Sequence, residues 1–561
     1  MKLRHFKQAA ATVAALLLIA SAPAQEQPQG DKVDLAVLAQ IKHEAFDNSK
    51  VMENLFYMSE VYGPRVNNSR NHRAAAEWAM KQMKEWGLQN VHLEKWPFGY
   101  GWQIKKYYAA MESPAYAAIP GFPLAWTPGT NGPITAEPIW APIHSKEDFA
   151  KYHGKLKGKI VLMFDPPTLR LHTTAEAQPS PTDEQILARA NAPGGGRGGR
   201  PAAAPGSPEA NRDPSGRGRP GEGTWVYTPT SLALANAKNS VLRAEVNTFM
   251  KEEGAAVVLT PGYNGDGGTI FATYGGNEDP KAPVPPPTVA IAAEQYNRIV
   301  RLLQHNITPK LTFDVQVEYQ KADTEAFNVI GEIPGTTKKD EVVMLGGHFD
   351  SWQGGTGATD NGTGSSVAME AVRILATLKK PMARTVRVAL WGGEEEGVYG
   401  SINYVQQHFA KRTTMVKTPE YDKFDVYFND DGGSGRFRGV SAGGSPQMAA
   451  IFRSWIEPIK DQHIVAVTGG DTFRPTLSPG GTDSTAFSWI GLNGIGFQQD
   501  GLEYGTRTHH SNADVYDRVQ KDDVMQGSMI EAWFAYNAAT RADMLPRIPT
   551  PAPDPNATGH E

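Results

Sequence analysis

The stretch GGHFDSWQGGTGATDNGTGSS, residues 346–366, decides the fold of this chain. It follows a short apolar run, Val342 to Leu345, which is rich in β-branched residues and predicts a buried strand. His348 and Asp350 come next at i and i+2, a spacing that places both side chains on one face of an extended chain. Apolar residues then recur at helical spacing, so we expect a helix to begin shortly after Asp360.

A second predicted strand, Thr385 to Trp391, ends in two glycines and the run Glu394-Glu395-Glu396. A strand, a helix and a strand with His and carboxylates at the strands' C-terminal ends is the arrangement in which an open α/β sheet builds its site. Imidazole and carboxylate bind borderline and hard cations, and a ligand His commonly donates its other ring N–H to a carboxylate. We therefore interpret His348 as a metal ligand and Asp350 as the carboxylate that orients it.

Three motifs in this region, GGHFDS, GATDNGTG and EEEGVYGS, resemble the central motifs of the di-zinc aminopeptidase family. That family includes bacterial leucyl-type aminopeptidases and carboxypeptidase Q. The resemblance implies two zinc ions per chain, bridged by one Asp, and a Glu that acts as the general base. Carried over by motif, the zinc ligands are His348, Asp360 (the bridging residue), Glu395, Asp430 and His510, and the base is Glu394.

The position of the second Asp ligand leaves an alternative open. Phe424 to Phe428 predicts a strand that runs into Asn429-Asp430-Asp431-Gly432. The family motif places the ligand at the end of the apolar strand, just before a turn of small residues. We therefore prefer Asp430, with Asp431 as the alternative.

The segment EYGTRTHHSNAD, residues 503–514, resembles the family pattern His-Ser/Thr-x-x-Asp. His510 fits this pattern, whereas His509 is one residue short of its spacing, and Asp514 is expected to order the loop that carries His510. Tyr504 stands where a phenol could stabilise an oxyanion, although a buried core tyrosine explains it equally well. Asp483 precedes a predicted helix and either contacts substrate or caps that helix.

Composition limits the remaining possibilities. At 561 residues the chain is too long for one ordinary core, so we expect two or more domains. A net charge of −5 and a charged fraction of 20% argue against nucleic acid as a partner. The sequence has no cysteine, which excludes a disulfide framework and a thiolate metal site or nucleophile. Any metal must be bound through nitrogen and oxygen.

Residues 1–24 predict a secretory signal, with Lys2, Arg4 and Lys7 before an apolar run and Ala22-Pro23-Ala24 as a cleavage site. The apolar run is about half of the ~20 residues that a membrane span needs. This favours cleavage over retention as an anchor. We expect an exported protein, periplasmic or secreted, that is not bound to a membrane after cleavage.

The domain organisation follows from the same patterns. Residues 25–115 and 313–545 are expected to form an α/β zinc exopeptidase domain, a mixed sheet with helices on both faces. Residues 116–312 predict short strands split by Pro and Gly, and GKIVL and GAAVVL in them resemble an inserted, β-rich protease-associated domain. Within it, the Gly-, Pro- and Arg-rich residues 178–223 predict a disordered loop rather than a nucleic-acid-binding segment. The Pro-rich tail, 546–561, is also predicted to be disordered.

The resemblance implies an exported, zinc-dependent exopeptidase, an aminopeptidase or dipeptidase, that cleaves peptides next to a free N-terminus. It implies a hydroxide bridging two zinc ions as the nucleophile and Glu394 as its base. A single-zinc glutaminyl cyclase-like enzyme is one alternative, which the presence of both His348 and Asp430 disfavours. A non-catalytic binding protein on a peptidase scaffold is another, and such proteins lose the ligands and the base. Side-chain preference and a homodimer stay open.

Overall fold

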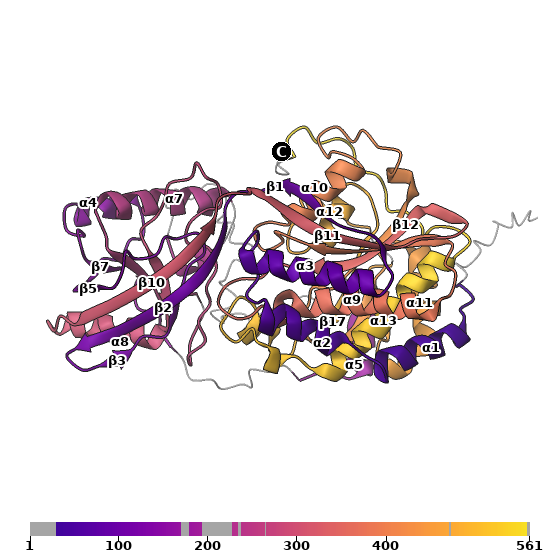
Figure 1. Ribbon diagram of the computed structural model, residues 1–561, viewed down its shortest axis with the longest axis horizontal. Coiled ribbons are helices and arrows are strands. Elements are labelled where there is room, and N and C mark those ends of the chain that lie inside the picture. Colours follow the sequence, from indigo (N-terminus) through magenta and orange to yellow (C-terminus); the bar gives the residue numbers. More distant parts are fainter. Residues whose placement is uncertain are drawn as a thin grey trace, which may run out of the picture.

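The computed structural model describes residues 30–169, 179–192, 227–233, 237–263, 265–470 and 473–557. They form two lobes lying side by side (Figure 1): a larger α/β lobe on an eight-stranded sheet, and a second lobe on two smaller sheets. The second lobe consists of the described residues in 101–169 and 227–320. The predicted signal lies outside the described residues. Among the helices that are described, none is long and apolar enough to cross a membrane.

The larger lobe confirms the predicted mixed α/β fold. In sheet order its strands are β1 (Gln89–Pro97), β11 (Glu325–Ile333), β13 (Arg384–Trp391), β12 (Lys338–His348), β14 (Phe424–Asn429), β17 (Gly494–Gln499), β15 (Phe437–Ser441) and β16 (Ala466–Thr468). β12 is parallel to both β13 and β14, and β14 is parallel to β17. The C-terminal ends of these parallel strands therefore meet at one edge of the sheet, where an α/β protein can build a site.

Helices cover both faces of this sheet, as predicted. Successive residues of β12 alternate between two cores, because Val343 and Leu345 pack on one side and Met344 on the other. The first core is closed by α1 (Leu35–Phe46), α2 (Val51–Phe56), α3 (Arg70–Glu85), α9 (Thr363–Leu378), α11 (Pro446–Ile456) and α13 (Lys521–Thr540). The second core is closed by α10 (Tyr399–His408) and α12 (Ser484–Trp489).

The second lobe is rich in β-structure. Its four-stranded sheet has the order β3 (Ala117–Ala118), β2 (Gly101–Ser113), β10 (Lys310–Gln320), β5 (Ile134–Ala136). Its five-stranded sheet has the order β4 (Gly121–Pro123), β9 (Thr288–Ile291), β8 (Val257–Thr260), β7 (Ile160–Leu162), β6 (Pro138–Trp140). Its helices are α4 (Phe149–Tyr152), α6 (Pro229–Ala233), α7 (Ala237–Glu252) and α8 (Ala293–Gln304).

The lobe boundaries differ from the expected 116–312. β2 and β10 pair with each other over their whole lengths and not with the eight-stranded sheet. The second lobe therefore begins near residue 101 and ends near residue 320, so residues 313–320 do not start the peptidase sheet. The reason is that β2 and β10 form one long antiparallel pair: the chain enters the second lobe along β2 and leaves it along β10.

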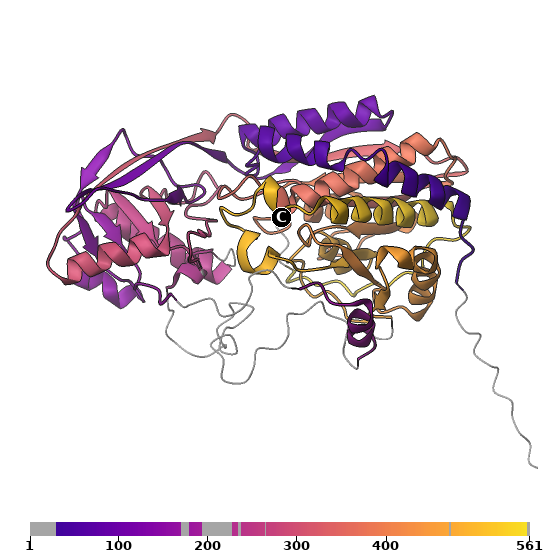
Figure 2. The same cartoon turned by 90° about the horizontal axis from the view of Figure 1, so that it is seen from below.

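The prediction of disorder over residues 178–223 is wrong for one segment, α5 (Asp183–Asn191). Thr182 begins this helix with a capping box, in which its hydroxyl accepts a bond from the backbone N–H of Gln185 (3.3 Å). Asp183 forms an ion pair with Arg438 of the larger lobe (2.6 Å), and Figure 2 shows α5 lying against that lobe. Composition could not reveal this distant partner. Residues 178 and 193–223 lie outside the described residues.

The C-terminal tail is ordered as far as residue 557, which contradicts the second prediction of disorder. Ile548 is only 7% exposed, and Asn493 donates to the backbone carbonyl of Pro546 (3.2 Å). Arg412 likewise donates to the carbonyl of Ala552. Proline lacks an N–H, but the carbonyls of a Pro-rich segment still accept hydrogen bonds. Side-chain donors of the larger lobe hold this segment in place.

Candidate metal centre

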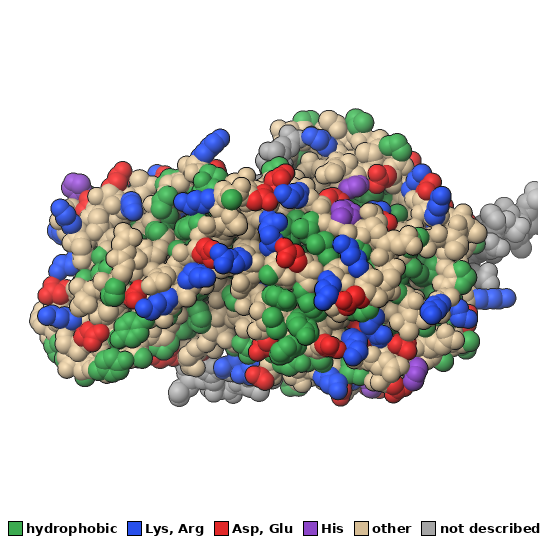
Figure 3. Space-filling view, in the orientation of Figure 1, with side chains coloured by type: hydrophobic (Ala, Val, Ile, Leu, Met, Phe, Trp, Pro, Cys, Tyr) green, Lys and Arg blue, Asp and Glu red, His purple; other side chains and the backbone are tan. Residues whose placement is uncertain are grey.

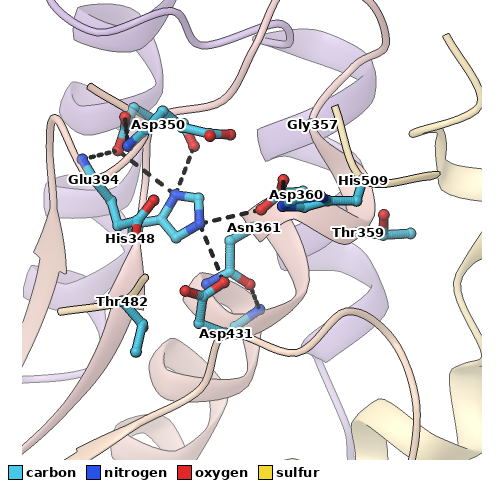
Figure 4. Close-up of polar contacts among 12 residues, drawn as sticks. His348, Asp350, Gly357, Thr359, Asp360, Asn361, Glu394, Asp431, Thr482 and His509 are labelled. Atoms are coloured by element: carbon cyan, nitrogen blue, oxygen red, sulfur yellow. Dashed lines mark hydrogen bonds and ion pairs between the residues drawn. The ribbon is translucent and has the colours of Figure 1, made fainter. Parts of the chain in front are cut away.

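His348 is the last residue of β12. Its ring lies between the carboxylate of Asp350 on one side and those of Asp360 and Asp431 on the other (Figure 4). Its Nδ1 is 3.1 Å from the backbone oxygen of Asp350 and 3.6 Å from a carboxylate oxygen of the same residue. Its Nε2 faces Asp360 at 3.2 Å and Asp431 at 3.4 Å. Nε2 is therefore the nitrogen available to a metal, and Asp350 lies on the opposite side of the ring, as the sequence predicts.

We call His348, Asp360 and Asp431 the first cluster, because one ligand atom of each lies within 4.8 Å of the others. Their side chains are 1%, 3% and 9% exposed. Burial raises the pKa of Asp360, but the charges of His509, His348 and His510 more than offset this and hold that pKa below its ordinary value. The neighbouring imidazoles therefore favour the charged form of Asp360.

The preference for Asp430 as a ligand is wrong, because Asp431 occupies the place in the first cluster. β14 ends at Asn429, and the two aspartates that follow it have different surroundings. Asp430 is buried, and among the described residues it belongs to neither group of ligand atoms that could share a metal ion. Burial, followed by the charge of Asp431, raises its pKa well above the ordinary value. Asp430 is therefore a buried core carboxyl group.

The second cluster consists of Asp360, Glu395 and His510. The Nε2 atom of His510 is 2.9 Å from Glu395 and 3.3 Å from the second carboxylate oxygen of Asp360. The ring of His509 stacks on that of His510, with 3.6 Å between their centroids, and its Nε2 is 3.6 Å from Asp360. His509 is thus a further candidate ligand, which the spacing pattern had passed over.

Asp350 also organises the neighbouring glutamates. Its two carboxylate oxygens accept the backbone N–H groups of Glu394 (3.3 Å) and Glu395 (3.2 Å). The chain must leave β13 here if both glutamates are to serve one site, and Gly393 makes this turn with a φ of +70°. Burial raises the pKa of Glu394 well above its ordinary value against the opposing charge of His348. A raised pKa suits a group that exchanges protons near neutral pH.

Two buried residues hold the loop between β12 and α9. The carboxylate of Asp514 accepts bonds from the backbone N–H groups of Thr359 (2.6 Å) and Asp360 (3.3 Å), so its side chain holds Asp360. Its own backbone N–H donates to the carbonyl of Ser511 (3.2 Å), a contact within the loop of His510, for which an ordering role had been expected. Arg65 donates to the carbonyls of Phe349 (2.7 Å) and Gly357 (2.9 Å). Arg65 comes from the turn Gly63-Pro64-Arg65, and no role for this arginine was predicted from the sequence.

Tyr504 and Asp483, each of which had two possible roles, have defined surroundings in the structure. Tyr504 donates its hydroxyl hydrogen to Asp360 at 2.9 Å, so in this structure it contacts a proposed ligand. Asp483 precedes α12 without capping it, because its side chain makes no bond to the first turn. It is fully buried, one of its oxygens accepts a bond from Ser401 (2.6 Å), and the other has no partner. Burial raises its pKa to about 8.

The residues of both clusters fit zinc. Two imidazoles and three carboxylates, with His509 as a further candidate, form a set of nitrogen and oxygen donors, the kind that zinc accepts. One oxygen each of Asp360 and Glu395 is buried without a hydrogen-bond partner, although buried polar atoms are normally satisfied. Asp360 contributes one oxygen to each cluster, as a bridging carboxylate would.

Comparison with known proteins agrees with this geometry. Residues 328–532 match peptidase family M28, and this range contains every residue of the two clusters. Carboxypeptidase Q of Homo sapiens is 24% identical over 519 residues, which is 92% of this chain and 89% of that protein. A probable leucine aminopeptidase 2 of Aspergillus oryzae is 28% identical over 44% of this chain and 46% of its own length.

Solved structures share the fold. A peptidase M28 precursor from Shewanella amazonensis SB2B aligns with a TM-score of 0.59 at 20% identity, over 92% of this chain and 99% of that one. BSAP, a zinc aminopeptidase from Bacillus subtilis, aligns with a TM-score of 0.52 at 16% identity, over 88% and 94% of the two chains. Both alignments extend well beyond residues 328–532, so the likeness includes much of the second lobe.

Proposed function

We propose that this chain uses two zinc ions to hydrolyse peptides next to a free N-terminus. The match of residues 328–532 to peptidase family M28 and the similarity to carboxypeptidase Q support a metallo-exopeptidase. The observation that carries this proposal is the placement of Asp360 between two groups of imidazoles and carboxylates. His348, Asp360 and Asp431 would hold one ion, and Asp360, Glu395 and His510 the other.

Glu394 is the proposed general base and acid. Bound zinc would polarise the substrate carbonyl and lower the pKa of a water molecule. With zinc bound, the carboxylate of Glu394 would accept a proton from this water and would donate it to the leaving amine. Glu394 lies beside His348 on the side away from Asp360 (Figure 4), and its backbone is held by Asp350. This position supports a role other than that of a ligand.

The chemistry of the site favours a substrate with a cationic end. Asp483 keeps one carboxylate oxygen unpaired in the interior, and the charges of His348 and Asp431 act on it. An ammonium group is a natural partner for such an oxygen, because an unpaired buried acceptor is costly. We propose Asp483 as a contact for the substrate amine and Tyr504 as a residue that orients Asp360.

The proposal also includes export of the protein and a peptide, rather than a nucleic acid, as its partner. The basic and then apolar start of the chain, followed by Ala-Pro-Ala, supports export by a signal that is cleaved. On the face drawn in Figure 3, acidic and basic side chains are interspersed across both lobes. The described residues of this face therefore offer no continuous basic surface, which fits a peptide substrate better than a nucleic acid.

A matched pair of neighbouring variants tests the mechanism. Glu394→Gln should keep two equivalents of zinc and lose turnover by about 10²–10⁴, the usual loss when acid–base help is removed, with no rescue by added zinc. Glu395→Gln should weaken one equivalent and recover part of its activity in excess zinc. Zinc content and the rate on a free dipeptide amide are measured for both variants, with the N-acetylated amide as the substrate control.

The outcomes separate the competing functions. If Glu394→Gln loses zinc and Glu395→Gln keeps it, the assignment of base and ligand is shifted by one residue. A wild-type chain with one equivalent of zinc would point to a cyclase-like enzyme, and one with none to a binding protein. Equal rates on the free and acetylated substrates would contradict recognition of a free N-terminus.

A further inference from the structure

We propose that the second lobe completes the second cluster, with Tyr263 as a positioning residue that sets the affinity of this cluster for zinc. Tyr263 belongs to the loop that follows β8, far in sequence from the ligands it serves. The inference rests on the metal centre proposed above, and it adds a role for the second lobe that the ligand motifs do not contain.

The contact is made on the side of His510 that faces away from the cluster. Nε2 of His510 faces Glu395 and Asp360, whereas its Nδ1 is 3.2 Å from the hydroxyl of Tyr263. With Nε2 directed at the metal side, Nδ1 carries the hydrogen and donates it to the phenol oxygen. Partners of this kind fix the tautomer and the ring orientation of a ligand histidine.

The backbone of His510 also needs support from outside its own loop. It has a φ of 66°, the left-handed region that residues other than glycine seldom adopt. Its carbonyl accepts the N–H of Ala272 (3.1 Å), and Ser511 forms an isolated antiparallel bridge with Phe271. Such conformations persist where the surroundings over-determine them. Here the surroundings are residues of the second lobe.

Further contacts of the same lobe hold the rest of this loop. The side-chain oxygen of Asn512 accepts the backbone N–H of Ile270 (2.7 Å), and the backbone N–H of Asn512 donates to the carbonyl of Ile270 (3.2 Å). Trp352 approaches the ring of His510 edge-on, with centroids 6.2 Å apart, and packs on Tyr274 of the second lobe at 4.8 Å. One ligand of the second cluster is therefore held on several sides from the second lobe.

The first cluster has no such dependence in the contacts described. The Nδ1 atom of His348 faces Asp350 of the larger lobe, and the hydroxyl of Ser365 donates to the carbonyl of His348 (2.7 Å). A loss of contact between the lobes should therefore affect one metal and spare the other. This asymmetry makes the inference measurable.

The test is Tyr263→Phe in the full-length chain, which removes one oxygen atom and keeps the ring. Stepwise zinc uptake is measured by competition with a chromogenic chelator, and His510→Ala identifies the step that belongs to the second cluster. That step should weaken by about 10–100-fold, the usual effect of removing a partner of a ligand histidine, while the other keeps its affinity. The visible spectrum of the cobalt-substituted second cluster should change as well.

Tyr296→Phe is the matched control. The hydroxyl of Tyr296 is buried in the core of the second lobe, where it donates to the carbonyl of Phe164 (2.8 Å) and contacts no ligand. Equal weakening in both variants would mean that general loosening of the lobe is the cause, and it would overturn the inference. Unchanged zinc affinity in Tyr263→Phe would overturn it too while leaving the metal centre intact. A wild-type chain that binds no zinc would instead refute the metal centre itself.

Discussion

The two clusters share Asp360 but are built in different ways. His348 ends a central strand and Asp431 follows another, and their side chains are 1% and 9% exposed. His510 lies on a loop in left-handed backbone and its side chain is 21% exposed. The first cluster thus inherits its geometry from the parallel core of the sheet, whereas the second depends on contacts between the lobes. Two adjoining clusters can therefore depend on different parts of the fold: one on the central sheet, and the other on the contact between the lobes.

The largest effect is expected at the residue that the clusters share. Asp360→Ala removes the bridging carboxylate, and we expect both equivalents of zinc to be lost, because each cluster keeps only its outer ligands. Activity should fall beyond the ~10²–10⁴ range that follows the loss of a single acid–base group. Metal content after gel filtration and kcat are the measurements. Retention of one tightly bound equivalent would show that one cluster is complete without Asp360.

The next effect should separate the two clusters. We expect His348→Ala and His510→Ala each to lose one equivalent of zinc, and the two losses to differ in kinetics. Because the loop of His510 is more exposed than the buried strand end, a dilute chelator should strip the wild-type second cluster first. His510→Ala should then show only the slow phase of zinc release, and His348→Ala only the fast one. Release with a single rate constant in the wild type would contradict this difference between the clusters.

The smallest expected effect concerns the stability of the fold and not the metals. It is expected at Asp425, near the start of the strand that leads to Asp431. Its carboxylate is fully buried, accepts the backbone N–H of Leu545 (2.7 Å) and lies 3.6 Å from Arg384. Burial raises its pKa from 3.8 to about 6. The folded state therefore binds a proton that the unfolded state releases between pH 4 and 6. The resulting stability is present below about pH 4 and is lost as the pH rises through 6.

Asp425→Asn should remove this dependence. Relative to the variant, the wild type should lose up to about 3 kcal/mol of unfolding free energy between pH 4 and 7, while zinc content stays the same. Thermal unfolding across this pH range is the measurement. Asp422→Asn, an exposed position three residues earlier, controls for the removal of a negative charge. A stability difference that does not change with pH would show that Asp425 is not the titrating group.

Sequence patterns were sufficient where local rules decide the outcome. The apolar strands and the helical spacing after Asp360 are short-range features. The strand predicted at Thr385 to Trp391 is β13, which begins one residue earlier, and the helix predicted shortly after Asp360 is α9, which begins at Thr363. His348 was predicted as a ligand from its place after an apolar strand, and Asp360, Glu395 and His510 were predicted from motifs that resemble those of a known family. His348 ends β12 and Glu395 follows the end of β13, and these two strands are parallel, so the fold brings both residues to one edge of the sheet.

What only the tertiary structure decided depends on contacts between distant segments. Neighbouring residues at a strand end point in different directions, so the exact end of β14 decides that Asp431 and not Asp430 enters the cluster. The side chain of Asp514 holds Thr359, 155 residues away in sequence, and Arg438 forms an ion pair with Asp183 of α5, 255 residues away. Tyr263 meets His510 only because the second lobe docks there, across 247 residues of sequence. Composition and spacing describe the chain around each residue, whereas these partners are set by the packing of the two lobes.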